Sequence, residues 1–188
     1  MNSQTILIIR HAEKPEPGVE AAGVDDKGRV DPKSLTPRGW LRAGAWLELI
    51  APSLATAPQI PLPTAVFASG PAGPDELAGS RSKRPLQTVS ALAGKLGITV
   101  EERFSKGQEQ ELASAISALD GVVLVCWQHE DIPLIARGLV PTPTGVPGLW
   151  PSDCFNVMFR FDRADAGASW SFTQVAPVML DGDKPDAL

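Results

Sequence analysis

Short apolar runs rich in β-branched residues alternate along this chain with longer segments whose apolar residues recur every three or four positions. The short runs predict buried strands over residues 5–9, 64–68 and 121–127. The longer segments predict helices over residues 36–50, 82–96, 108–119 and 131–139. Strands that alternate with helices, without any internal repeat, predict an α/β fold: a three-layer α/β/α sandwich with a mostly parallel central sheet.

The remaining apolar runs are shorter or less regular. They predict a short strand over residues 98–104 and a closing pair of strands over 154–161 and 169–175. Segments rich in glycine and proline predict loops, notably the segment SGPAGPDELAGS at 69–80.

Size and charge exclude several classes of protein. With 188 residues, 43% of them hydrophobic, the chain is expected to form a single domain over 1–188. A net charge of −5 argues against a nucleic-acid partner, which would need an excess of Lys and Arg. We expect no membrane partner and a cytoplasmic location, because no window is apolar enough to span a bilayer and the N-terminus does not resemble a leader. Oligomeric state has no readable signal.

The chain has only two histidines, and each follows an apolar run that is predicted to be a strand. His11 lies in IIRHAEKP and His129 in VLVCWQHEDIP. Ligands of parallel α/β sheets bind beyond the carboxyl ends of the strands, where both imidazoles are expected. Arg10 precedes His11, and Arg84 opens a predicted helix, so two arginines and two imidazoles are expected to surround one tetrahedral anion. Cationic neighbours keep an imidazole neutral, which suits it to attack phosphorus.

Four sequence blocks resemble the histidine phosphatase (phosphoglycerate mutase-like) superfamily. ILIIRHAEKP is similar to its RHG signature, with Ala12 in place of glycine, and LTPRGWLRAGAWL is similar to its LTxxGxxQAxxLA helix. SRSKRPLQTVSAL resembles the SxxxRxxQTA segment, and VLVCWQH matches the block of the second histidine. The four blocks occur in family order and span most of the chain.

The resemblance implies a phosphoglycerate mutase-like fold and a two-step phosphoryl transfer. His11 would be the nucleophile that becomes phosphohistidine, and Arg10, Arg84 and His129 would bind the phosphoryl group. Arg81 and Lys83 lie nearby, but the spacing to the QT pair favours Arg84. Because the cationic pocket neutralises the charge, the reaction would need no metal and no cofactor. The partner would be a small phosphorylated metabolite or a phosphoprotein.

A carboxylic acid must protonate the leaving oxygen, and the sequence offers three candidates. Glu130 is the first, because some branches of the superfamily carry the proton donor directly after the second histidine. Glu13, next to the nucleophile, and Glu109, in SKGQEQEL, are the alternatives. Spacing alone does not rank the three.

Hydrolysis of a phosphomonoester is the leading functional hypothesis. The alternatives are a phosphomutase of the same fold and a catalytically silent phosphate- or phosphopeptide-binding module. The substrate is left open, because specificity is expected to lie in the loops over 15–34, 70–81 and 141–151, which have no readable motif.

Overall fold

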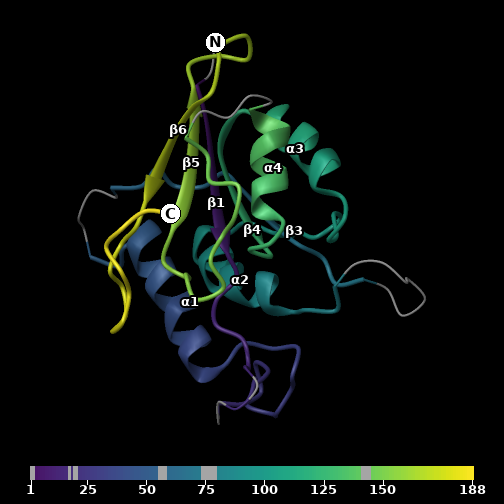
Figure 1. Cartoon of the computed structure of the whole chain (residues 1–188), viewed down its shortest axis with the longest axis vertical. Helices are drawn as coiled ribbons and strands as arrows, with labels where there is room; N and C mark the ends of the chain where they lie inside the picture. Colours follow the sequence, from purple (N-terminus) through teal and green to yellow (C-terminus); the bar gives the residue numbers. More distant parts are fainter. Residues whose placement is uncertain (1–2, 17, 19–20, 55–58, 73–79, 141–144) are drawn as a thin grey trace.

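The computed structural model describes residues 3–188 except 17, 19–20, 55–58, 73–79 and 141–144. Within this part of the chain, strands and helices alternate before a closing pair of strands (Figure 1). In chain order they are β1 (Gln4–Arg10), α1 (Pro37–Ile50), β2 (Ala65–Ala68), α2 (Arg84–Leu96), β3 (Val100–Glu101), α3 (Glu109–Ser117), β4 (Gly121–Trp127), α4 (Ile132–Leu139), β5 (Met158–Arg163) and β6 (Ser171–Val175).

The described strands form one sheet in the order β3-β2-β4-β1-β5-β6. The strands β3, β2, β4 and β1 run parallel to one another, whereas β5 runs antiparallel to β1, and β6 antiparallel to β5. In the centre, β1 and β4 pair over their whole lengths, so that Arg10 lies opposite Trp127 at their carboxyl ends. The predicted mostly parallel sheet is therefore confirmed.

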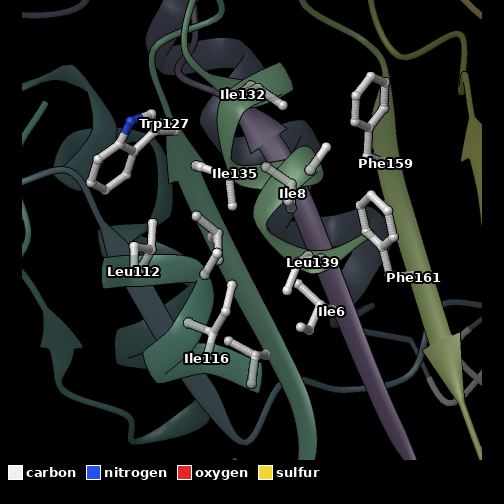
Figure 2. Close-up of a cluster of buried hydrophobic side chains, with 14 of the residues drawn as sticks. Ile6, Ile8, Leu112, Ile116, Trp127, Ile132, Ile135, Leu139, Phe159 and Phe161 are labelled. Atoms are coloured by element: carbon white, nitrogen blue, oxygen red, sulfur yellow. The ribbon is translucent and has the colours of Figure 1, made fainter. Parts of the chain in front are cut away.

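Helices cover both faces of this sheet and bury its two cores. On one face, Ile6, Ile8 and Phe159 belong to a cluster that α3 and α4 complete. Figure 2 shows side chains of this cluster from β1, β4 and β5 beside those from α3 and α4. On the other face, Leu7 and Ile9 pack with residues of α1 and α2. Because alternate residues of β1 serve opposite cores, the strand is apolar throughout, and the three-layer sandwich is confirmed.

The described helices lie close to the predicted ranges because their end signals are local. The Thr36 side chain accepts a hydrogen bond from the Gly39 backbone N–H at the start of α1, and Pro37 follows it directly. Gly97 ends α2 with φ at +69°, a left-handed conformation that favours glycine. None of the helices in the described residues is both long enough and apolar enough to cross a bilayer.

Two predicted strands differ most from their expected ranges. The strand predicted over 98–104 is reduced to Val100–Glu101. The strand predicted over 154–161 runs from Met158 to Arg163 instead, and the carbonyl of Cys154, where it was expected to begin, accepts a hydrogen bond from Arg10. Most of the 69–80 insertion lies outside the described residues, as do parts of the three loops expected to determine specificity.

Candidate active site

Both histidines follow the carboxyl ends of the two central strands. The His11 backbone N–H donates to the carbonyl of Trp127 at 3.0 Å, which continues the β1–β4 ladder by one residue. His129 lies two residues beyond the end of β4. The sequence expectation that the two imidazoles share one edge of the sheet therefore agrees with the topology.

His11 is buried and held in one tautomer. Its Nδ1 lies 2.8 Å from the backbone carbonyl oxygen of Ala12. Because a carbonyl only accepts hydrogen bonds, Nδ1 carries the proton and Nε2 retains the lone pair. Burial lowers the pKa of His11 to about 3, and the charges of Arg10 and Arg84 act in the same direction. At neutral pH the ring is thus a neutral imidazole, the form that a nucleophile needs.

Arg10 is fully buried, and its guanidinium is fixed on two sides. Nη1 donates to the carbonyl oxygens of Pro151, Ser152 and Cys154, at 3.3, 2.7 and 2.9 Å. The Phe155 ring covers one face, with its centre 3.7 Å from Cζ of Arg10. Burial lowers the pKa of Arg10 to about 10, which leaves it charged at neutral pH.

The other edge of the Arg10 guanidinium has no hydrogen bond to any described residue. Nε and Nη2 are buried, and neither has a hydrogen-bond partner among the described residues. Unpaired buried donors are rare in proteins because each costs roughly 1–3 kcal/mol. Nε and Nη2 together form the fork that binds two oxygens of a carboxylate or phosphate side by side. Because the guanidinium is fixed, its Nε–Nη2 edge is oriented to bind such a group.

Arg84 is the half-buried member of the basic run that opens α2. It donates from Nε to the Ser34 carbonyl, from Nη2 to the Pro32 carbonyl and from Nη1 to the Ser82 hydroxyl. Three of the five guanidinium N–H groups are thus used, one on each nitrogen. Arg81 and Lys83 are exposed. The charge of Arg84 is one of the causes that lower the pKa of His11.

The QT pair ties α2 to the loops of the site. Thr88 Oγ1 accepts a hydrogen bond from the Ala12 backbone N–H and donates to the Arg84 carbonyl. Gln87 accepts from the Leu35 backbone N–H and donates to the Ser34 hydroxyl. These side chains therefore hold the segment after His11 and the loop before α1 in place, a role that the motif alone does not reveal.

Gly39 brings α1 against the segment that follows His11. A Cβ atom at this position would lie 2.6 Å from the carbonyl oxygen of Glu13 and 3.1 Å from its backbone nitrogen. That carbonyl also accepts a hydrogen bond from the Thr36 backbone N–H at 3.0 Å. The glycine of the helix motif is thus explained by close approach of two backbones.

His129 is in contact with the residue that follows it. Its Nδ1 lies 2.7 Å from Oε2 of Glu130, whose other oxygen contacts Nζ of Lys106, also at 2.7 Å. The close contacts with His129 and Lys106 hold the pKa of Glu130 well below its ordinary range, against the effect of burial. The Glu130 side chain is 47% exposed.

Glu13 and Glu109 have structural partners. Oε1 of Glu13 accepts from Arg42 Nε at 2.8 Å and lies 3.3 Å from Arg38 Nε. Oε1 of Glu109 accepts from the Trp127 indole N–H and from the Gly107 backbone N–H, both at 3.0 Å. Each of these two carboxylates thus stabilises a loop or a strand end.

Two further carboxyl groups have features that the sequence did not single out. Burial raises the pKa of both Asp131, next to Glu130, and Glu102, which directly follows β3. A raised carboxyl pKa is typical of general acids. The raised pKa of these two carboxyl groups comes from burial in the folded protein and not from a motif, so sequence patterns do not identify them.

In the described part of the chain, no three His, Cys, Asp or Glu side chains are grouped so that they could bind a metal ion. Cys126 is buried and Cys154 is half-buried, and both are free thiols. Burial raises the pKa of each thiol, which disfavours the thiolate that binds metals.

No protein-family model matches this sequence, and no curated protein sequence matches it either. Solved structures with the same fold do exist. A candidate phosphohistidine phosphatase SixA from Nakamurella multipartitia aligns over 95% of this chain and 98% of its own, with a TM-score of 0.54 and 17% identity. The protein histidine phosphatase SixA in complex with tungstate aligns over 92% of this chain and 96% of its own, with a TM-score of 0.55 and 15% identity.

A third similar structure is the phosphoglycerate mutase of Plasmodium falciparum, which aligns over 100% of both chains with a TM-score of 0.54 and 10% identity. At such low identities the likeness concerns the fold. The chain has a phosphoglycerate mutase-like fold, and the predicted resemblance to the histidine phosphatase superfamily fits these neighbours.

Proposed function

We propose that this protein is a phosphatase that hydrolyses a phosphomonoester through a phosphohistidine intermediate at His11, without a metal ion. The observation that carries the proposal is the pairing of a neutral, buried imidazole with a neighbouring guanidinium whose bidentate edge has no partner among the described residues. The first group supplies a nucleophile, and the second matches two oxygens of a phosphoryl group.

In the first step Nε2 of His11 attacks phosphorus, and the bond between phosphorus and the leaving oxygen breaks. That oxygen takes a proton from a carboxylic acid and departs as an alcohol. In the second step the resulting carboxylate takes a proton from water, the water oxygen attacks phosphorus, and the bond between phosphorus and Nε2 breaks. Phosphate is released, and His11 returns to its neutral form.

Charge on the transferring group is stabilised by the cations around it. Arg10 binds two phosphoryl oxygens through Nε and Nη2, and Arg84 contributes through the N–H groups that the loop carbonyls leave free. The ring of His129 contacts a third oxygen through Nε2, while its Nδ1 lies against the Glu130 carboxylate. Fixed donors of this kind lower the barrier without reorganisation, so a metal ion is not required.

Glu130 is our first choice for the proton donor. Its carboxylate is 47% exposed, against 12% for Glu13, and Glu109 is buried with two donors of its own. Its low pKa in the free protein favours the charged form, but a bound phosphoryl dianion raises the pKa of a nearby carboxyl by repulsion. Glu13, Glu109, Glu102 and Asp131 remain the alternatives for the variants below.

The substrate class is a phosphoprotein or a small phosphorylated metabolite. One similar structure is named as a candidate phosphohistidine phosphatase and another as a protein histidine phosphatase, so a phosphohistidine peptide belongs beside an aryl phosphate among the first substrates to test. The similarity to a phosphoglycerate mutase makes transfer to an alcohol acceptor the matching test for the mutase alternative.

The deciding experiment compares hydrolysis of an aryl phosphate by the native protein and by His11→Asn, with and without EDTA. We expect His11→Asn to lower kcat by at least about 10³-fold, and EDTA to have no effect. Acid quench during turnover should trap an acid-labile, base-stable phosphoenzyme at His11. Phosphate binding without turnover in the native protein would instead identify a silent binding module, and loss of activity in EDTA would overturn the metal-free proposal.

The acid is then identified by conservative variants. Glu130→Gln should lower kcat by roughly 10²- to 10⁴-fold, the usual contribution of a general acid. The matched variants Glu13→Gln, Glu109→Gln, Glu102→Gln and Asp131→Asn are expected to have smaller effects. A larger loss in any of these would reassign the role.

A further inference from the structure

The turn formed by residues 151–155, here called the Arg10 turn, is built around one side chain. Three of its carbonyl oxygens accept from the same nitrogen, Nη1 of Arg10. Its last residue, Phe155, lies face-on to the same guanidinium at 3.7 Å. The carbonyls fix the position of Nη1, whereas the ring fixes the plane of the whole group.

Phe155 differs from the other phenylalanines of the chain in what it packs against. All the others belong to, or pack against, the cluster on the α3–α4 face of the sheet, and Phe155 belongs to none of the hydrophobic clusters among the described residues. Its ring contacts Arg10, and the guanidinium of Arg42 lies 6.0 Å from the ring centre. Phe155 also lines a cavity of about 290 Å³ whose lining holds both basic side chains, such as Lys14 and Arg38, and acidic ones, such as Asp183. Phe155 therefore packs against guanidinium groups rather than within a hydrophobic cluster.

The Arg10 turn is itself held from outside by the C-terminal segment. Nδ2 of Asn156 donates to the carbonyls of Pro177 and Lys184, at 3.1 and 2.7 Å. The Trp150 indole N–H donates to the Cys154 carbonyl at 2.9 Å, so the turn is anchored before and after Phe155. A ring anchored in this way keeps its place when no ligand is present.

We propose that Phe155 is a positioning residue that fixes the Arg10 guanidinium so that its Nε–Nη2 edge meets the phosphoryl oxygens. The inference rests on the proposed function, because it takes that edge to be the phosphate ligand. A stacked ring leaves the guanidinium free to bind in its own plane and restricts tilting out of it. The guanidinium therefore loses less conformational entropy when the oxyanion binds, which strengthens binding.

The test measures binding of inorganic phosphate by calorimetry, together with KM and kcat for an aryl phosphate. Phe155→Leu keeps an apolar side chain of similar size but removes the aromatic face, and Phe155→Tyr restores that face. We expect Phe155→Leu to weaken phosphate binding about 3- to 30-fold, the range of a cation–π contact, and Phe155→Tyr to bind within about 2-fold of the native protein.

Trp170 provides a matched control at the opposite end of the sheet. Its ring lies 4.3 Å from Cζ of Arg163, whose Nε donates to Gln4 at the start of β1. Trp170→Leu also removes an aromatic face from an arginine, and it should leave phosphate affinity unchanged. A purely structural role of Phe155 would lower the unfolding temperature in Phe155→Leu and leave affinity, measured well below that temperature, at the native value.

Equal phosphate affinity in the native protein and Phe155→Leu, or equal weakening in Phe155→Tyr, would overturn the proposal. If Phe155→Leu does not fold, the Arg10 Nε–H resonance of the native protein decides: a shift on addition of phosphate supports the inference, and no shift refutes it. A native protein that binds phosphate but does not hydrolyse the ester refutes the proposed hydrolysis alone. A native protein that binds no phosphate refutes both.

Discussion

The Nδ1 atom of His129 lies 2.7 Å from a carboxylate oxygen of Glu130, and Lys106 contacts the other oxygen of the same carboxylate. The second histidine is thus in close contact with its immediate neighbour in the chain, and that neighbour forms an ion pair with a lysine just before α3. The contact leaves Nε2 of His129 as the ring nitrogen for a ligand.

Removal of the lysine should raise the pKa of Glu130. Close contacts with His129 and Lys106 both lower that pKa, so Lys106→Met removes one of the two stabilising contacts of the ionised form. A carbon-detected NMR titration should show the Glu130 carboxyl titrating at higher pH than in the native protein. The exposed Lys27 offers a charge-matched control, Lys27→Met, which should leave the titration unchanged. An unshifted Glu130 in Lys106→Met would show that the contact is absent in solution.

Activity should not fall near the ordinary pKa of histidine. Burial lowers the pKa of His11 from 6.5 to about 3, so the imidazole stays neutral at pH 5. In a profile of kcat/KM against pH, the loss of activity that comes from protonation of the nucleophile is therefore expected near pH 3. A single-proton loss of activity near pH 6.5, accompanied by a matching loss of the trapped phosphoenzyme, would contradict the buried, neutral state.

The same shift links His11 to stability. The unfolded chain binds a proton at this residue below about pH 6.5, whereas the folded chain does so only near 3, so folding is favoured above the unfolded value. The His11 contribution is fully present above pH 6.5 and is lost as pH falls toward 3, with a slope of at most about 1.4 kcal/mol per pH unit. Urea unfolding at several pH values should show a weaker pH dependence for His11→Asn in this window.

A buried ion-pair network joins the C-terminal segment to the segment after His11. Arg42, only 2% exposed, donates to both oxygens of Asp183 at 2.7 and 3.0 Å and to Glu13 at 2.8 Å. Asp183 also accepts from the backbone N–H groups of Met179 and Leu180. Arg42→Met should destabilise the protein by roughly 3–5 kcal/mol, because two carboxylates lose their shared partner. Denaturant unfolding measures the loss.

Arg29 offers the control for this network. Its Nε and Nη2 both contact Oδ2 of Asp25, but on the surface, where the arginine side chain is 71% exposed. Exposed pairs of this kind contribute little to stability. Arg29→Met should therefore leave the unfolding midpoint unchanged, and a loss as large as that of Arg42→Met would refute a special role for the buried pair.

Two glycines of α1 should respond in opposite ways to alanine. At Gly39 a Cβ atom would lie 2.6 Å from the Glu13 carbonyl oxygen, whereas at Gly44 nothing lies within 4 Å. Alanine favours a helix over glycine by about 1 kcal/mol, so Gly44→Ala should stabilise the protein. At Gly39 the clash outweighs this gain, and Gly39→Ala should destabilise it by about 1–3 kcal/mol and lower activity. Thermal unfolding and the aryl phosphate assay test both effects, and two variants of the same sign would contradict the close approach of the two backbones.

The layered fold was predictable because each element has a local signal. The strand Gly121–Trp127 is a continuous apolar run, and α1 begins with a threonine cap and a proline. The strand predicted from residue 154 fails over its first four residues for a non-local reason. The apolar alternation of that segment fits a strand, but the carbonyl of Cys154 accepts from Arg10, 144 residues earlier, and the Asn156 side chain donates to carbonyls of the C-terminal segment.

The site residues also fall into two groups, those with a local sequence signal and those positioned by contacts between distant segments. His11 and His129 could be placed because a strand end and a motif precede each of them. The partners of Glu13 and Glu109 could not be predicted, because Arg42 and Trp127 are brought to them by packing of distant elements. Phe155 has no sequence signal at all, since a phenylalanine that covers a guanidinium has the same local pattern as one in a core.

The register of β1 and β4 has a consequence for how this protein can change. Neighbouring strands lie about 4.8 Å apart, and Arg10 is paired with Trp127 at their ends, so the sheet itself sets the separation between the segments that carry the two imidazoles. The 69–80 loop, like the other loops expected to determine specificity, lies outside these two strands. Under the proposed function, new substrates would be accommodated by rebuilding such loops, by natural variation or by design, while the segments that carry the two imidazoles stay in register.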